Sequence, residues 1–233
     1  MNKLTAIVPI FNEENTVKIS IENLLKINEI SQIILVDDCS NDSSLEIINE
    51  FLKINRDILI LQTPKNSGKG GAVRMALNSV KSEYVIVHDA DLEYNPRDIP
   101  QLLEKAEKNK NVDVVLGSRF IGSKTRRNIY LRTYLANKFL SYLFSVINRK
   151  KVTDVATCYK LIKNEIYKSI ELTKNGFEYE IEVLSKALSH TKEFDEVPIE
   201  YNARSYKDGK KIKLSDGFKS VSYTHLTLPT RCL

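Results

Sequence analysis

Short apolar runs alternate with amphipathic stretches through the first half of the chain. The runs that predict buried strands are Leu4–Ile10, Ile33–Val36, Ile58–Leu61, Tyr84–Val87 and Val112–Leu116. Apolar residues with helical spacing lie between them, at Val17, Ile21, Leu24 and Leu25; at Leu45, Ile48 and Leu52; at Val73, Ala76, Leu77 and Val80; and, after Pro96, at Ile99, Leu102, Leu103 and Ala106. Strands separated by helices predict an α/β fold with a mostly parallel sheet.

The second half of the chain has a less regular pattern. Its predicted elements are an amphipathic, aromatic-rich helix over Leu131–Ile147, an edge strand over Val155–Ile162, a helix through Ile181, Leu184 and Leu188, and a strand through Val197, Ile199 and Tyr201. A polar basic loop, Asn202–Lys213, follows. Neither an internal repeat nor a long linker divides the chain, so residues 1–220 are predicted to form a single domain.

The final segment, residues 221–233 (VSYTHLTLPTRCL), breaks this pattern. It has no helical period, and it resembles the translation of a sequencing adapter read through the end of a gene fragment. We therefore expect it to be non-native and to lie outside the domain. A genuine short terminal strand is the alternative.

Composition places the chain among ordinary globular proteins, with 42% apolar and 28% charged residues. We find no apolar run of membrane-spanning length and no signal-peptide pattern at the N-terminus. The three cysteines, Cys39, Cys158 and Cys232, are widely spaced, which argues against a disulfide framework and against a cysteine metal site. A reducing, cytoplasmic setting fits best.

The net charge of +5 is unevenly distributed. The stretch from Arg119 to Thr153 contains nine Lys and Arg residues and no Asp or Glu, and the rest of the chain is net acidic. One basic stretch on an acidic body predicts a local anionic partner rather than nucleic acid. The alternative is a solvated helix face followed by a loop.

Polar residues gather at the predicted carboxyl ends of the strands, where ligands bind in sheets of this kind. These ends carry Pro9–Glu13, Asp37 and Asp38, His88–Asp91, and Gly117–Arg119. Asp89 and Asp91, with Glu93 two residues further on, offer oxygen ligands suited to Mg²⁺ or Mn²⁺. An acidic strand end with a purely structural role is the alternative.

Other chemistries find little support. The run Asn66–Gly71 has no hydroxyl residue after its Lys-Gly pair and follows the third strand, so it is not a Walker A loop. The first strand leads into Pro-Ile-Phe-Asn-Glu-Glu without the glycines of a dinucleotide fingerprint. The scattered histidines argue against a zinc site, and His88 is interpreted as structural. No serine lies in a G-x-S-x-G motif.

The segments AIVPIFNEENTV, ILVDDCSNDSS, NSGKGGAVRMAL, VHDADLEYNP and LGSRF follow one another in the order and spacing of glycosyltransferase family 2. The chain resembles members of that family, which have the GT-A fold with a Rossmann-like, mostly parallel sheet. Through TDVATCYKLI, GFEYEIEVLSKAL and VPIEYNARSYKDGKKI it is similar to the dolichyl- or polyprenyl-phosphate mannosyl- or glucosyltransferases. The resemblance covers about residues 3 to 220.

The resemblance implies roles at matching positions. Residues that would line the nucleotide base and ribose are Pro9, Phe11, Glu13, Val36 and Asp38. Asp89 and Ala90 would lie against the donor, with Lys69 nearby, and Asp91 and Glu93 would hold the metal ion. Arg119, Arg204 and Lys210 would meet phosphates. Two positions depart from the usual pattern, since Phe11 stands where most members have tyrosine and Glu93 where many have glutamine.

The expected reaction is a metal-dependent transfer of a hexose from a nucleotide sugar to a polyprenyl or dolichyl phosphate, with inversion. A cation and guanidinium groups can neutralise the diphosphate leaving group. A lipid phosphate is already anionic, so it needs a cationic seat, with Arg119 and Arg132 as candidates, more than a general base. Asp154 is the candidate base or orienting carboxylate. Alternatives are a glycan or other acceptor, or an idle nucleotide-sugar-binding module.

An amphipathic helix with basic residues and an apolar face through Leu135, Phe139, Leu143 and Phe144 is typical of peripheral membrane contact. The predicted location is therefore the cytoplasmic face of a membrane. Packing of the same apolar face on the sheet is the alternative.

Overall fold

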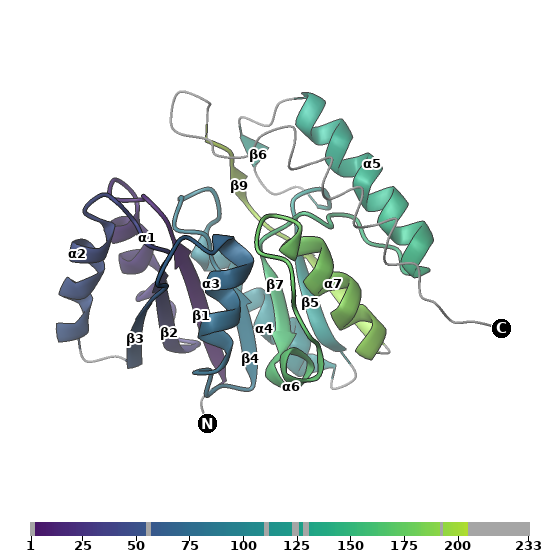
Figure 1. Ribbon diagram of the computed structural model, residues 1–233. Coiled ribbons are helices and arrows are strands. Elements are labelled where there is room, and N and C mark those ends of the chain that lie inside the picture. The colour runs from purple at the N-terminus through teal and green to yellow at the C-terminus, as the bar shows by residue number, and fades with distance from the viewer. Residues whose placement is uncertain are drawn as a thin grey trace.

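The computed structural model describes residues 3–54, 57–109, 112–122, 126–127, 131–191 and 193–204. Its centre is a sheet of seven strands in the order β3-β2-β1-β4-β7-β5-β8 (Figure 1). The strands are β1 (Leu4–Ile10), β2 (Ile30–Asp37), β3 (Asp57–Gln62), β4 (Tyr84–Val87), β5 (Val112–Ser118), β7 (Lys160–Lys163) and β8 (Glu193–Pro198). Every predicted run of the first half forms a strand, which gives the expected α/β fold.

The predicted edge strand over Val155–Ile162 is wrong in its position. Only the end of that run forms β7, and β7 lies between β4 and β5, antiparallel to both. Val85 faces Ile162 across one ladder and Leu116 faces Lys160 across the other. Leu161 and Ile162 are fully buried, as a central strand requires. The other pairings in the sheet are parallel.

Helices form where the apolar spacing predicts them. They are α1 (Val17–Leu24), α2 (Ser44–Asn49), α3 (Gly68–Leu77), α4 (Ile99–Lys108), α5 (Leu131–Asn148), α6 (Asn164–Ser169) and α7 (Tyr179–His190), with 3-10 turns at Glu50–Lys53 and Pro96–Asp98. Leu52 lies in the first 3-10 turn rather than in α2, and Val80 lies beyond the end of α3. The short helix α6 was not predicted, because six residues carry too few turns to show a period.

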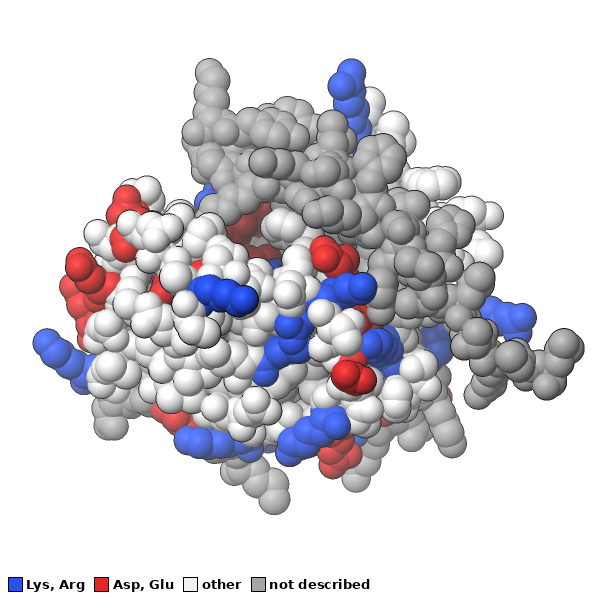
Figure 2. Space-filling model, in the orientation of Figure 1, with Lys and Arg blue, Asp and Glu red and all other residues white. Residues whose placement is uncertain are grey.

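The layers of the molecule follow from this order. Helices α3 and α7 lie side by side over one face of the sheet (Figure 1), where the Gly70 N–H donates a hydrogen bond to the Asn175 carbonyl. The apolar residues of β1, β2, β4 and β5 form the centre of the core, and Ile7, Leu35 and Val115 are fully buried there. On the face shown in Figure 2, acidic and basic side chains are interspersed among uncharged ones.

A two-stranded parallel ladder lies apart from the main sheet. Its strands are β6 (Arg126–Arg127) and β9 (Tyr201–Asn202). The predicted strand through Val197, Ile199 and Tyr201 is therefore divided between β8 and β9. The segment 221–233 and most of the basic loop over 202–213 lie outside the described residues. The single domain over residues 1–220 and the non-native tail stay predictions.

Helix α5 differs from the predicted amphipathic helix in which side chains it buries. Phe144 is fully buried, whereas Leu135 and Phe139 are 56% and 61% exposed. Leu135 and Phe144 are nine residues apart, about two and a half helical turns, so they lie on opposite faces. The exposed apolar stripe is Leu131, Leu135, Phe139, Tyr142 and Val146. Within the described residues, we find no helix with the length and apolar character needed to cross a bilayer.

Candidate active site

A cavity of about 470 Å³ lies where the predicted strand ends meet. The predicted site residues that line it are Pro9, Phe11, Glu13, Asp38, Lys69, Asp89, Ala90, Asp91, Glu93, Arg119 and Arg204. They come from β1, from the segments after β2, β4 and β5, from α3 and from the segment after β9. The strand-end argument thus brought together residues that are far apart in the sequence.

Three predicted site residues that the structure describes do not line the cavity, and a fourth is not described. Val36 is fully buried inside β2, where its side chain belongs to the core. Asp154 is fully buried behind Arg119, and Arg132 is exposed near the start of α5. Lys210 lies outside the described residues.

The Asp38 carboxylate is held by the segment that starts α3. Its Oδ1 atom accepts hydrogen bonds from the Thr63 hydroxyl at 2.7 Å and from the Ser67 backbone N–H at 2.8 Å, and its Oδ2 atom accepts one from the Gly68 N–H at 2.7 Å. Gly68 begins the helix with φ of +74°, a conformation that glycine adopts without strain. The glycine-rich run that resembles a phosphate loop therefore anchors a carboxylate here.

Arg204 connects the two acidic sides of the cavity. Its guanidinium donates to both oxygens of Glu13, at 3.1 and 3.2 Å, and its Nη2 atom lies 3.2 Å from Asp91 Oδ2. Arg204 Nε is buried and has no hydrogen-bond partner among the described residues. One guanidinium thus partly neutralises two carboxylates from different segments of the chain.

The negative charge of Asp91 is only partly compensated by its surroundings. Burial raises the pKa of Asp91 to about 7, and the nearby Asp89 and Glu93 carboxylates add to the increase. Arg204 and a 3.1 Å hydrogen bond from the Glu93 N–H oppose this increase only in part. A cation beside Asp91 would offset the free-energy cost of keeping this buried carboxylate ionised next to two other carboxylates.

Both oxygens of Glu93 are occupied by the chain itself. Oε2 accepts a hydrogen bond from the Tyr201 hydroxyl at 2.5 Å, and Oε1 accepts one from the Arg204 backbone N–H at 2.7 Å. The carboxylate therefore connects the segment after β8 to the loop that follows β4 and carries Asp89, Asp91 and Glu93, the acidic loop. A metal ion at Glu93 would have to compete with these two donors, so Asp91 is the better placed of the two predicted ligands.

Arg119 is paired with Asp154 behind the cavity wall. Arg119 Nε and Nη2 donate to the two oxygens of Asp154, each at 2.7 Å, and the Arg119 backbone N–H donates a third hydrogen bond at 3.0 Å. Its guanidinium carbon lies 4.8 Å from the centre of the Tyr201 ring. Burial alone would lower the pKa of Arg119, but Asp154 raises it well above its ordinary value. This geometry favours Asp154 as an orienting group over a base.

His88 has contacts that account for a structural role. Its Nε2 atom lies 3.0 Å from the Ser20 hydroxyl and its Nδ1 atom lies 2.9 Å from the Tyr159 hydroxyl. Burial lowers the pKa of His88 to about 4, so the ring is neutral at neutral pH.

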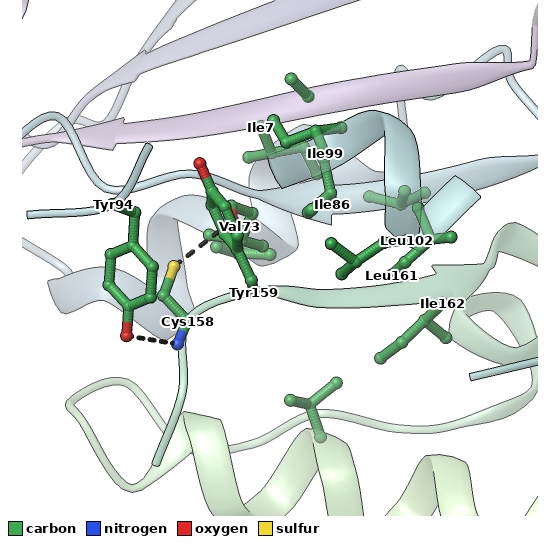
Figure 3. Close-up of a cluster of buried hydrophobic side chains, with 14 of the residues drawn as sticks. Ile7, Val73, Ile86, Tyr94, Ile99, Leu102, Cys158, Tyr159, Leu161 and Ile162 are labelled. Atoms are coloured by element: carbon green, nitrogen blue, oxygen red, sulfur yellow. Dashed lines mark hydrogen bonds between the residues drawn. The ribbon is translucent and has the colours of Figure 1, made fainter. Parts of the chain in front are cut away.

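Sequence reasoning missed several residues of the cavity wall, namely Tyr94, Ala156, Cys158, Phe177, Glu180 and Tyr201. Figure 3 shows Tyr94 beside Cys158, whose backbone N–H donates to the Tyr94 hydroxyl at 3.0 Å. Lys69 and Asp89 form an ion pair at 2.6 Å, and Lys69 also lies 2.7 Å from Glu180. The missed residues lie inside the quoted motifs or next to them, but no local spacing connects them to the strand ends.

The fold has close relatives among solved structures. The complex of glucosyl-3-phosphoglycerate synthase from Mycobacterium tuberculosis with Mn²⁺, UDP and phosphoglyceric acid superimposes with a TM-score of 0.73 at 16% sequence identity. The alignment covers 97% of this chain and 78% of that one. A complex of the same enzyme with Mn²⁺, UDP-glucose and phosphoglyceric acid gives a TM-score of 0.70 at 15% identity, over 96% and 78% of the two chains. The fold is the GT-A fold of nucleotide-sugar transferases.

Sequence comparison gives the family. Residues 5–171 match glycosyl transferase family 2. Over 224 residues the chain is 31% identical to the uncharacterized protein MJ0544 of Methanocaldococcus jannaschii, which covers 90% of this chain and 94% of the relative. It is 26% identical over 230 residues to the low-salt glycan biosynthesis hexosyltransferase Agl6 of Haloferax volcanii; that match covers 97% of this chain and 54% of Agl6, about half of its length. The chain therefore belongs to glycosyl transferase family 2 and is a glycosyltransferase.

Proposed function

We propose that this glycosyltransferase moves a hexose, mannose or glucose, from a nucleotide sugar to a polyprenyl or dolichyl phosphate. The reaction would use Mg²⁺ or Mn²⁺ and would invert the anomeric centre. One observation carries the proposal: a single cavity contains the Asp89 and Asp91 carboxylates together with the Arg119 and Arg204 guanidinium groups. Carboxylates suit a metal-bound diphosphate, and guanidinium groups suit phosphate oxygens.

The donor end of the cavity is the end near β1 and β2. Pro9, Phe11 and Asp38 line it, so an aromatic ring and a buried carboxylate are available to a nucleoside. The M. tuberculosis enzyme was crystallised with UDP-glucose, and Agl6 is named a hexosyltransferase, which supports a nucleotide hexose as the donor. The diphosphate would then extend toward Asp91 and the guanidinium groups.

The residues at Asp91 fit a divalent cation. The described residues contain no group of three or more His, Cys, Asp or Glu able to hold a metal ion together. Mg²⁺, however, often binds through one or two carboxylates, with phosphates and water as its other ligands. Asp91, with its raised pKa and its cavity position, would be such a carboxylate. When bound, the ion would neutralise charge that develops on the leaving diphosphate.

Arg204 would change partners when the donor binds. It now contacts Glu13 and Asp91, and a donor diphosphate, with one negative charge on each phosphate, would offer it several oxygen acceptors at once. Together with the cation, this guanidinium would stabilise the nucleoside diphosphate as it leaves, so no proton donor is required.

The acceptor would approach from the side of Arg119. Nη1 of Arg119 lies outside the ion pair with Asp154, which uses Nε and Nη2. A phosphate monoester is anionic near neutral pH, so attack on the anomeric carbon needs little help from a base. Asp154 would hold the guanidinium in place, and direct displacement would invert the anomeric centre.

The lipid character of the acceptor is supported by α5. Its exposed stripe contains Leu135, Phe139 and Tyr142, and α5 belongs to the acid-free basic stretch that continues from Arg119. Apolar side chains flanked by basic ones suit the interface of a membrane with anionic headgroups. We infer that α5 rests on the cytoplasmic face of a membrane and presents the lipid phosphate to Arg119.

A second acceptor class has a specific observation in its favour. The M. tuberculosis enzyme was crystallised with phosphoglyceric acid, a small soluble phosphate, and Agl6 is named for glycan biosynthesis. The three acceptor classes are thus a lipid phosphate, a soluble phosphate and a glycan.

The test is a transfer assay with labelled UDP- and GDP-hexoses and three acceptors: polyprenyl phosphate in vesicles, 3-phosphoglycerate and an oligosaccharide. We expect a labelled lipid phosphate whose formation stops with EDTA and resumes with Mn²⁺. Transfer only to one of the soluble acceptors would replace the lipid assignment. Donor binding without transfer to any acceptor, and without donor hydrolysis, would favour an idle binding module.

A further inference from the structure

Four charged side chains form an alternating chain that begins at the cavity wall, where Asp89, Lys69 and Glu180 lie, and ends at Lys160. Asp89 Oδ1 lies 2.6 Å from Lys69 Nζ, Lys69 Nζ lies 2.7 Å from Glu180 Oε1, and Glu180 Oε2 lies 2.5 Å from Lys160 Nζ. The side chains of Lys69, Glu180 and Lys160 are between 2% and 12% exposed. The two carboxylates and two ammonium groups balance each other in charge, so the network can be buried as a whole.

The Lys69 ammonium is surrounded by three groups of the chain. Its Nζ atom lies at ion-pair distance from Asp89 and Glu180 and donates a hydrogen bond to the Cys158 sulfur at 3.3 Å. Glu180 Oε1 accepts no hydrogen bond from the described residues, so its contact with Lys69 is one of charge alone. Burial would lower the pKa of Lys69, but the charge of Asp89 raises it well above its ordinary value. Lys69 therefore acts on the cavity by holding the Asp89 carboxylate.

The position of Lys69 depends in turn on α7. Glu180 lies in the first turn of α7, whereas Lys69 lies at the start of α3. The two elements are in tight contact, since a Cβ atom added at Gly70 of α3 would lie 3.0 Å from the Cβ atom of Tyr179, the first residue of α7. Lys160 of β7 fixes the second oxygen of Glu180. Three elements outside the acidic loop thus determine where the Lys69 ammonium lies.

We propose that Glu180 is a positioning residue for Asp89. Glu180, held by Lys160, fixes the Lys69 ammonium, and that ammonium sets the direction of the Asp89 carboxylate at the donor side of the cavity. The proposal rests on the proposed contact of Asp89 with the nucleotide-sugar donor. It assigns the GFEYEIE segment to donor binding, although the segment lies about ninety residues after the acidic loop.

Electrostatics explains why Asp89 needs such support. Asp89, Asp91 and Glu93 bring three carboxylates into one short loop, so each like charge must be offset by groups outside it. The Lys69 ammonium, 2.6 Å from Asp89 Oδ1, is the cation that offsets the Asp89 charge. Without a fixed ammonium, the Asp89 carboxylate would turn away from its like-charged neighbours.

The test uses a double variant, because Glu180→Gln alone would leave buried positive charges unpaired. Glu180→Gln with Lys160→Met removes the outer ion pair as a unit and keeps side-chain volume, a replacement that often leaves folding stability nearly unchanged. The Lys69–Asp89 pair remains, but its anchor is lost. The control is Lys186→Met, which removes the ion pair with Glu182 from the same helix, away from the cavity.

Initial rates are measured over a range of donor concentrations and, separately, of acceptor concentrations, along with the melting temperature. We expect the double variant to melt close to wild type and to lose at least tenfold in kcat/KM for the nucleotide sugar, with an unchanged KM for the acceptor. The control should match wild type in both kinetic quantities, although its melting temperature falls because the buried Glu182 carboxylate loses its ammonium partner. Donor binding by calorimetry should weaken in the double variant alone.

Three results would overturn the proposal. Donor kinetics equal to wild type in a folded double variant would show that Asp89 needs no anchor. An equal loss in the Lys186→Met control would show a general effect of α7 stability. If wild type itself neither bound nor used any nucleotide sugar, the proposed function would fail, and this inference would fail with it.

Discussion

Asp154 accepts three hydrogen bonds from one residue, Arg119, two from its guanidinium and one from its backbone N–H. The pair is buried, and it connects the end of β5 to the segment before β7. A carboxylate with all three of these hydrogen bonds is suited to orienting the arginine rather than to accepting a proton from a substrate. The orientation of Arg119 at the cavity is therefore fixed before any ligand arrives.

Asp154→Asn should weaken the use of acceptor and destabilise the fold. An asparagine keeps the shape but leaves the buried Arg119 charge unpaired, which costs about 3 kcal/mol or more in the free energy of unfolding. Urea denaturation measures that change, and transfer kinetics should show a KM for acceptor phosphate raised at least tenfold with donor KM near wild type. A stable variant with normal acceptor kinetics would contradict the orienting role.

Asp91→Asn should abolish transfer and weaken Mn²⁺ binding while leaving the melting temperature at pH 8 unchanged or higher. The reason is that Asp91 is a buried carboxylate whose pKa is about 7, so its charge is costly unless a cation is present. Wild type should bind Mn²⁺ more tightly at pH 8 than at pH 6, because protons compete with the ion. Electron paramagnetic resonance of free Mn²⁺ measures both effects. Transfer by the variant in metal-free buffer would rule out the proposed metal site.

Acidification should destabilise the protein through His88. Its pKa is about 4 in the folded state and near 6.5 in an unfolded chain, so between these values the unfolded state binds the extra proton. The contribution of His88 to the free energy of unfolding is therefore fully present above pH 6.5. It falls by about 3 kcal/mol as the pH drops toward 4. Chemical denaturation across this range checks the slope. His88→Gln should flatten it, and the exposed His190→Gln should not.

Replacing Leu135 and Phe139 on α5 by serine should reduce binding to anionic vesicles at least tenfold. Both side chains are exposed, so the melting temperature should stay near that of wild type. The apparent KM for polyprenyl phosphate should rise, and donor KM should not. The matched control is Leu52→Ser, which removes an apolar side chain that is 55% exposed outside α5. Equal vesicle binding by the α5 variant and wild type would favour a soluble acceptor.

Deleting residues 221–233 should change neither the melting temperature nor donor binding. The segment has no period that would pack it on the domain. Differential scanning calorimetry of the shortened chain measures the melting temperature. A value lower by several degrees would show that the segment is a genuine part of the fold.

Most of the sheet could be predicted because central parallel strands need continuous apolar runs, and β1, β2, β4 and β5 have them. The place of β7 could not be predicted in this way. Its four residues would fit an edge or a centre equally well, and only pairing with strands some fifty to eighty positions earlier decides between them. The local sequence predicts that a strand forms, but it does not predict which strands pair with it.

The same limit applies to the site. The strand-end rule gathered Asp38, Asp89, Asp91 and Arg119 without any knowledge of contacts. It could not show that Glu93 is held by Tyr201, which is 108 positions later, or that Val36 points into the core. Residue type and position predict where charge collects, whereas the role of each charge depends on partners that only the tertiary structure supplies.

The central place of β7 has a consequence for how the chain reaches its folded state. The strands β3, β2, β1 and β4 belong to one side of the sheet and β5 and β8 to the other, and β7 alone joins them. During synthesis, β4 and β5 leave the ribosome well before residues 160–163, with hydrogen-bonding edges open. The sheet can close only when β7 inserts, a non-local step that should come late and slowly. Nascent chains that have passed β5 but not β7 should therefore be the species most prone to aggregate and most dependent on chaperones.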